Sequence, residues 1–164
     1  MTKRYCLDTN VLIQAWNNYY SMELCPEYCA ILDDLATKNS VFCTDEVKRE
    51  IEKIDDDLCT WVKGRPHLFC DGTEDVQRQL RTVLARFPRL VDTAGDRSMA
   101  DPWVVAHALH TGATVVTKET PSPPGTKRIK IPDVCRAFSV RCINDFQFVT
   151  EIGIRFTARR VPTE

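Results

Sequence analysis

The stretch RYCLDTNVLI, residues 4–13, decides the expected fold. Asp8 interrupts an apolar run of about eight residues, and Thr9 and Asn10 follow it. A short apolar segment that ends in a polar turn is typical of a buried strand in a parallel sheet. We therefore predict a strand over residues 4–8 with Asp8 at its carboxyl end. Asp is also common in such turns for local hydrogen bonding, so its position alone does not establish a functional role.

Length and composition indicate an ordinary globular protein. The chain has 164 residues, of which 43% are hydrophobic and 27% charged. We predict one domain over residues 1–164, with a core at about 4–152 and a basic tail at 153–164. Residues 118–164 hold 9 basic and 5 acidic side chains, whereas residues 1–117 hold 13 and 18, so the carboxyl-terminal part can attract a polyanion.

Eight cysteines would suit a disulfide scaffold in a small secreted protein. The amino-terminal stretch does not resemble a signal peptide, and no run of ~18 apolar residues could cross a bilayer. We therefore expect a cytoplasmic protein with no membrane contact, whose reduced cysteines are mostly small apolar core residues. Zinc held by Cys25, Cys29, His67 and Cys70 is the alternative.

Short apolar segments alternate with amphipathic ones along the chain. This order predicts an α/β fold whose parallel sheet is covered on both faces. Strands are expected at 4–8, 40–44, 113–117 and 141–143, and helices at 11–19, 26–38, 45–54, 58–63, 74–87, 100–110, 134–138 and 144–152. Ligands of such sheets bind beyond the carboxyl ends of the strands, where Asp8 is expected.

Three further acids can reach that edge. In the helix predicted at 45–54, Glu50 lies about 60° from the centre of the apolar stripe, whereas Glu52 lies about 140° away. Asp101 precedes a proline at a helix start, which is also the pattern of a helix cap, and Glu119 follows the strand at 113–117. Each acid alone has an ordinary structural explanation. Clustered carboxylates repel unless a cation neutralises them, and oxygen ligands suit Mg²⁺ or Mn²⁺.

These residues also make the sequence resemble the PIN domain, a metal-dependent nuclease family that includes VapC-type toxins. The resemblance rests on LDTNVLI, EVKREI, ADPWVVAHALHTGATVVT and the TKE that follows, and it spans residues 4 to about 146. It implies a three-layer α/β/α sandwich with a mainly parallel sheet, and hydrolysis of RNA by a metal-activated water. By motif position, Asp8, Glu50, Asp101 and Glu119 would be catalytic, metal-binding acids, with Asn10 and Thr117 in support.

One departure from the family pattern concerns Glu119, which stands where the family usually has Asp. The carboxyl-terminal part resembles a less characterised PIN-like branch found in bacteria, which favours nuclease chemistry over a toxin role. RNA is the expected substrate, and its phosphates would meet Lys118, Lys127, Arg128 and Lys130. The resemblance also implies an antitoxin protein for toxin members and a homodimer, although the residues themselves show neither.

Two other functions remain open from the sequence. A catalytically inactive PIN-like module would bind RNA or protein without cutting. Haloacid dehalogenase-like phosphatases also begin with an Asp after the first strand, but they need a second acid two residues later, and here that residue is Asn10.

Overall fold

Five parallel strands form the centre of the molecule. The computed structural model describes residues 2–91 and 99–162, and in this part the strand order is β3-β2-β1-β4-β5. Every pairing is parallel, and β1 lies in the middle. The strands are β1 Tyr5–Leu7, β2 Val41–Thr44, β3 Phe69–Cys70, β4 Thr114–Val116 and β5 Cys142–Ile143.

The strand order reverses between β1 and β4. From β1 the chain builds outward to β2 and β3, then returns to β4 on the other side of β1 and continues to β5. In open α/β sheets, ligands bind in the crevice beyond the carboxyl ends of the strands at such a point. Asp8 directly follows β1 and Thr117 directly follows β4, and the Asp8 N–H donates to the Val116 carbonyl over 2.9 Å.

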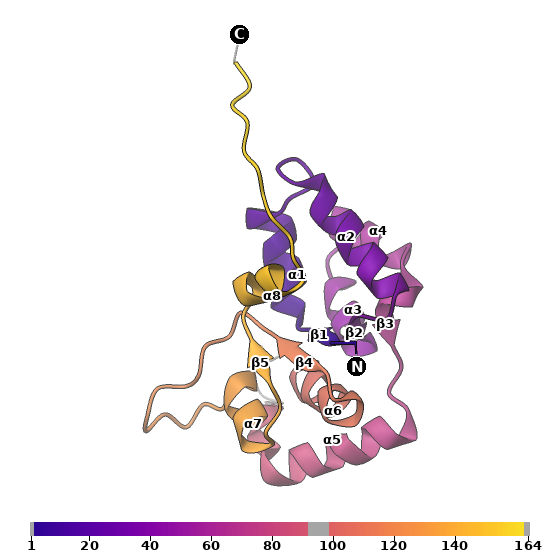
Figure 1. Ribbon diagram of the computed structural model, residues 1–164. Coiled ribbons are helices and arrows are strands. Elements are labelled where there is room, and N and C mark those ends of the chain that lie inside the picture. Colours follow the sequence, from indigo (N-terminus) through magenta and orange to yellow (C-terminus); the bar gives the residue numbers. More distant parts are fainter. Residues whose placement is uncertain (1, 92–98, 163–164) are drawn as a thin grey trace.

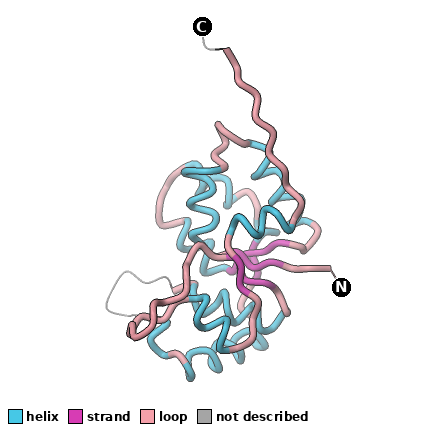
Figure 2. Tube along the Cα trace, turned by 60° about the vertical axis from the view of Figure 1, so that its left-hand side comes forward, coloured by secondary structure: helices cyan, strands magenta, loops and turns pink. Residues whose placement is uncertain are grey.

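Helices cover both faces of the sheet (Figures 1 and 2). In Figure 1, α5, α6 and α7 lie below it, and α2, α4 and α8 lie above it. This arrangement confirms the predicted three-layer α/β/α fold. The helices are α1 Thr9–Gln14, continued by a π-helical turn at Ala15–Tyr19, α2 Pro26–Thr37, α3 Asp45–Ile51, α4 Asp57–Lys63, α5 Glu74–Arg86, α6 Asp101–Thr111, α7 Ile131–Ala137 and α8 Asp145–Glu151, with 3₁₀ turns at Pro66–Leu68 and Pro88–Leu90.

Most helix boundaries follow from local chemistry that the sequence displays. The Thr44 side chain accepts a hydrogen bond from the Val47 N–H and caps α3. Gly112 ends α6 in the left-handed conformation at φ 70°, which costs a glycine little. The predicted end of α3 is wrong: the helix stops at Ile51, and Ile54 is 60% exposed. Asp56 adopts an extended backbone to cap α4, so the helix must end before it.

The core contains five buried cysteines, Cys6, Cys29, Cys43, Cys59 and Cys135. All eight cysteines are free. His67, weighed as a zinc ligand, instead places its Nε2 2.6 Å from Asp33 Oδ1. The edge strand β3 was not predicted, because a two-residue strand carries no periodicity. Within residues 2–91 and 99–162, no helix has the length and apolar character needed to span a membrane.

Candidate active site

Asp8 is 2% exposed and lies at the end of β1, where it caps α1. Its Oδ1 accepts a hydrogen bond from the Thr9 N–H over 2.7 Å. Its Oδ2 accepts from the Thr117 hydroxyl over 2.8 Å and from the Asn10 amide over 2.7 Å. Burial raises the pKa of Asp8 to about 7 despite these donors, and the charges of Glu119 and Glu50 add to the increase. Ionised Asp8 is therefore costly unless a cation is near.

Asn10 and Thr117 connect Asp8 to the end of β4. The Asn10 Oδ1 accepts a hydrogen bond from the Lys118 N–H over 3.0 Å, which leaves its NH₂ group directed at Asp8. The Thr117 hydroxyl accepts a 3.1 Å hydrogen bond from the Glu119 N–H while donating to Asp8. The Asn10 side chain is an amide whose two ends are both hydrogen-bonded within the protein. The position two residues after Asp8 therefore offers no carboxylic acid to donate a proton, as the phosphatases need.

Glu50 links the first residue of α1 to the residue that precedes α6. The Thr9 hydroxyl donates to its Oε2 over 2.5 Å, and the Ala100 N–H donates to its Oε1 over 3.3 Å. The helical-wheel argument placed Glu50 at the border of the packed face, and the side chain is indeed half-buried there. Glu52 turns away and forms a 3.9 Å ion pair with Lys48.

Asp101 and Glu119 approach from two other segments. Asp101 was considered as a helix cap, but Ala100 occupies the cap position and Asp101 is the first helical residue. Glu119 accepts a 2.8 Å hydrogen bond from the Ile131 N–H through its Oε2, so its carboxylate also fixes the start of α7.

All four acids line one cavity of about 320 Å³ at the carboxyl edge of the sheet. Thr9, Asn10 and Arg128 also line it. In the part of the chain that the structure describes, no three acidic, histidine or cysteine side chains lie close enough to hold one metal ion together. The structure thus gathers the four predicted acids around one space, while Glu50 and Glu119 are hydrogen-bonded to protein donors.

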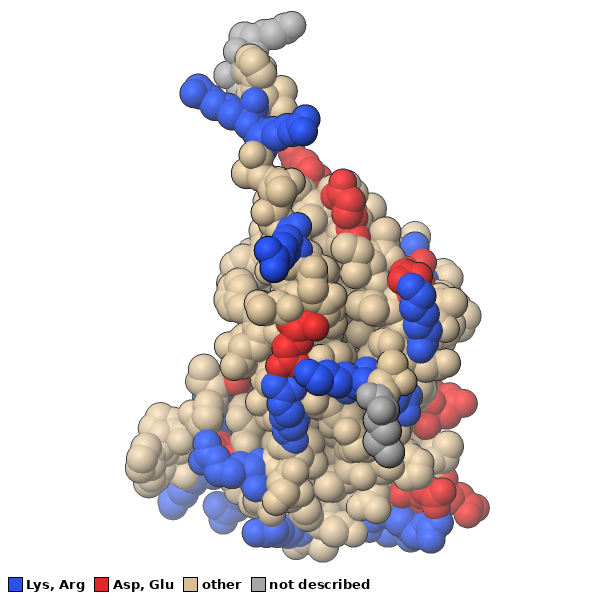
Figure 3. All heavy atoms as spheres, viewed as in Figure 1, with Lys and Arg blue, Asp and Glu red and all other residues tan. Residues whose placement is uncertain are grey.

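The predicted basic residues have different surroundings. Lys118 is only 15% exposed, and its ammonium lies 2.8 Å from Asp145 Oδ2, over the rings of Tyr19 and Phe146. Lys127 is exposed, Lys130 precedes α7, and Arg128 lines the acidic cavity. Figure 3 shows Lys and Arg side chains along the carboxyl-terminal tail and over the lower part of the face in view.

Sequence reasoning missed two parts of this site. The Thr9 hydroxyl bonded to Glu50 had a detectable signal, because it is a polar residue beside Asp8 at the sheet edge. The pairing of Lys118 with Asp145 had no such signal, since the two residues are 27 positions apart and meet only because the start of α8 lies beside the loop after β4.

Comparison with known protein families assigns the chain to one of them. A family model described as a domain of unknown function, DUF4411, matches residues 5–156. The chain belongs to the DUF4411 family. A comparison with curated proteins gives no match for this DUF4411 member.

Solved structures share its fold. One is a chain of VapBC2 from Rickettsia felis bound to a promoter DNA fragment, with a TM-score of 0.51 and 18% identity over 85% of this chain and 97% of that one. Another is a chain of DNA-bound VapBC from Salmonella typhimurium, with a TM-score of 0.50 and 20% identity over 87% and 98%. The DUF4411 chain thus has the PIN-like fold that its motifs led us to expect. Its place in a bacterial PIN-like branch stays a prediction.

Proposed function

We propose that this DUF4411 protein is a metal-dependent endoribonuclease that hydrolyses RNA phosphodiester bonds with a water activated by Mg²⁺ or Mn²⁺. The observation that carries the proposal is the cavity of about 320 Å³ lined by Asp8, Glu50, Asp101 and Glu119, which come from four separate segments. Packing alone gives no reason to collect four carboxylates at a topological switch point, because like charges repel.

The donor set fits a hard divalent cation. Carboxylate oxygens without His or Cys are the ligands that Mg²⁺ and Mn²⁺ prefer. Burial is the main cause of the raised pKa of Asp8, and the charges of Glu119 and Glu50 add to it, so a bound cation would stabilise the ionised carboxylate. Asp8, Glu50, Asp101 and Glu119 would hold the ion. When bound, the ion would lower the pKa of a water and offset charge on the phosphodiester.

The remaining residues have positioning roles in this proposal. Asn10 and Thr117 hold Oδ2 of Asp8 in a fixed orientation, and Thr9 orients Glu50. Arg128 lines the same cavity and would contact the RNA phosphate, with Lys127 and Lys130 farther along the backbone. The ammonium of Lys118 is already paired with Asp145, so we now assign Lys118 to positioning the loop that carries Thr117 and Glu119.

A toxin role with an antitoxin partner, a homodimer and a cytoplasmic location complete the proposal. The antitoxin is supported by the likeness in fold to chains of two VapBC structures.

The test is cleavage of mixed cellular RNA by purified protein with and without Mn²⁺. We expect Mn²⁺-dependent cleavage that Asp8→Asn and Asp101→Asn each abolish. Glu52→Gln is the matched control: it removes an acid two residues from Glu50, just past the end of α3, that pairs with Lys48 and does not line the cavity. Cleavage that survives Asp8→Asn would reject the proposal.

A non-catalytic PIN-like module that binds RNA or protein is the second candidate. It is favoured by the absence, among the described residues, of three side chains close enough to share a metal ion. This candidate predicts RNA binding without cleavage at any Mn²⁺ concentration, and an affinity that Asp8→Asn leaves unchanged.

A further inference from the structure

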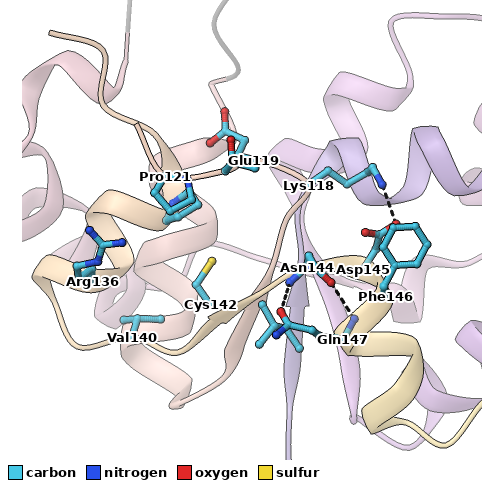
Figure 4. A pocket seen from close by; sticks show the side chains of 13 residues that line it. Lys118, Glu119, Pro121, Arg136, Val140, Cys142, Asn144, Asp145, Phe146 and Gln147 are labelled. Carbon is cyan, nitrogen blue, oxygen red and sulfur yellow. Dashed lines mark hydrogen bonds and ion pairs between the residues drawn. The ribbon is translucent and has the colours of Figure 1, made fainter. Parts of the chain in front are cut away.

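A second cavity (Figure 4) lies next to the acidic one, and Glu119 lines both. Its volume is about 540 Å³, within the range of sites that bind small molecules. It opens at the carboxyl ends of β4 and β5, between the loop after β4 and the segments that flank β5.

The walls of this cavity combine apolar surface with one exposed cation. Pro121, Pro132 and Val140 supply apolar surface, and Arg136 lies on the side opposite Phe146 in the view of Figure 4. The guanidinium of Arg136 is exposed and has no ion pair within 4.0 Å among the residues that the structure describes. Phe146 is 55% exposed, which leaves part of its ring open to a ligand.

Other polar side chains around the cavity already have partners within the protein. Lys118 pairs with Asp145 over 2.8 Å, and both side chains are nearly buried. Asn144 and Gln147 satisfy each other across the start of α8, where each side chain accepts a hydrogen bond from the other residue's N–H. Arg136 is thus the cation best placed to receive an anionic group, and Phe146 is the exposed ring.

We propose that this cavity binds one unpaired nucleotide of the RNA beside the bond to be cut. Arg136 would contact a phosphate, while Phe146 stacks on the base and the proline rings line the pocket. Single-stranded nucleic acids are bound in this manner, by cations along the backbone and aromatic rings against the bases. The cavity shares Glu119 with the acidic site, so a nucleotide seated in it would place its neighbouring phosphodiester near the four carboxylates.

The consequence is a preference for single strands. A base in a duplex is stacked and paired, and turning it out into a pocket costs free energy, whereas an unpaired base enters without that cost. This inference rests on the proposed nuclease function and adds the form of the substrate to it.

The test uses binding and cleavage together. Affinities for a fluorescein-labelled single-stranded RNA and for a hairpin of the same composition are measured by anisotropy in the Asp8→Asn background. Into this background we introduce Arg136→Gln, Phe146→Leu and, as an obstruction from the exposed loop, Thr120→Trp. Phe156→Leu is the matched control, since Phe156 is 49% exposed but stacks on Tyr20 and does not line the cavity.

We expect Arg136→Gln and Phe146→Leu each to weaken single-strand binding by about tenfold, the effect of losing one phosphate contact or one stacked base. Thr120→Trp should also weaken it, by obstructing the cavity, and all three variants should change hairpin binding little. With Asp8 intact, KM should rise and kcat should remain within about threefold. Melting by circular dichroism verifies folding. Unchanged single-strand affinity, or an equal loss for the hairpin, overturns the pocket assignment.

These results also separate the two proposals. If the Arg136 and Phe146 variants lose single-strand binding while the wild-type protein never cleaves RNA, the nuclease proposal fails and the pocket remains an RNA-binding site. If cleavage depends on Asp8 but all three cavity variants behave as wild type, the nuclease proposal stands and this inference is wrong.

Discussion

Replacing Asp8 by Asn should change how the stability of the metal-free protein depends on pH. In the unfolded chain Asp8 ionises near its ordinary pKa of 3.8, whereas burial raises the folded value to about 7. Between these two values the folded state binds a proton that the unfolded state has released. The Asp8 contribution to stability is therefore complete at low pH and is lost as the pH rises towards 7.

The size of this contribution follows from the shift. One pKa unit corresponds to about 1.4 kcal/mol, so the rise from 3.8 to about 7 lowers the free energy of unfolding by about 4 kcal/mol above neutral pH. Asp8→Asn removes the ionisation but disturbs the hydrogen bonds from Asn10 and Thr117, at a cost of about 1–2 kcal/mol. We expect a net gain of about 2–3 kcal/mol for the variant at pH about 8.

Urea denaturation of both proteins without metal, across pH about 4 to 8, measures this difference. Burial also lowers the pKa of His107 to about 4, which makes stability rise with pH over part of the same interval. His107 is present in both proteins, so its contribution cancels in their difference. Mn²⁺ should stabilise the wild type more at high pH, where Asp8 is ionised, and affect the variant little. Stability curves that run parallel with pH would refute the reasoning.

Two further predictions concern packing around the site. Lys118→Met should lower the free energy of unfolding by about 3 kcal/mol in chemical denaturation, because it leaves the buried Asp145 carboxylate unpaired. Adding Asp145→Asn should restore most of that loss. A loss below about 1 kcal/mol would mean that the pair behaves as a surface ion pair. Gly72→Ala places a Cβ 2.4 Å from the Trp103 ring and should lower the free energy of unfolding by about 1–3 kcal/mol. The control Gly64→Ala, whose Cβ has its nearest neighbour at 3.7 Å, should shift the urea midpoint little. Equal shifts for the two variants would contradict the close contact at Gly72.

Local chemistry explains why much of the fold was predictable. The apolar strand before Asp8, the Thr44 cap and the left-handed Gly112 each depend on residues within a few positions of one another. The alternation of such segments indicates a parallel sheet, and a parallel sheet directs the carboxyl ends of its strands to one edge. The two-residue strand β3 escaped prediction because pairing with β2, not periodicity, defines it.

The sequence by itself determined the α/β class and the residues that stand at strand ends and helix starts, because these features arise from nearest-neighbour hydrogen bonding and hydrophobic periodicity. Only the tertiary structure decided how those residues meet. The Thr9 hydroxyl on Glu50, the Lys118 ammonium on Asp145 and the cavity flanked by Arg136 and Phe146 join segments from different elements. Such contacts depend on how whole helices pack against the sheet, and no short stretch of sequence determines that packing.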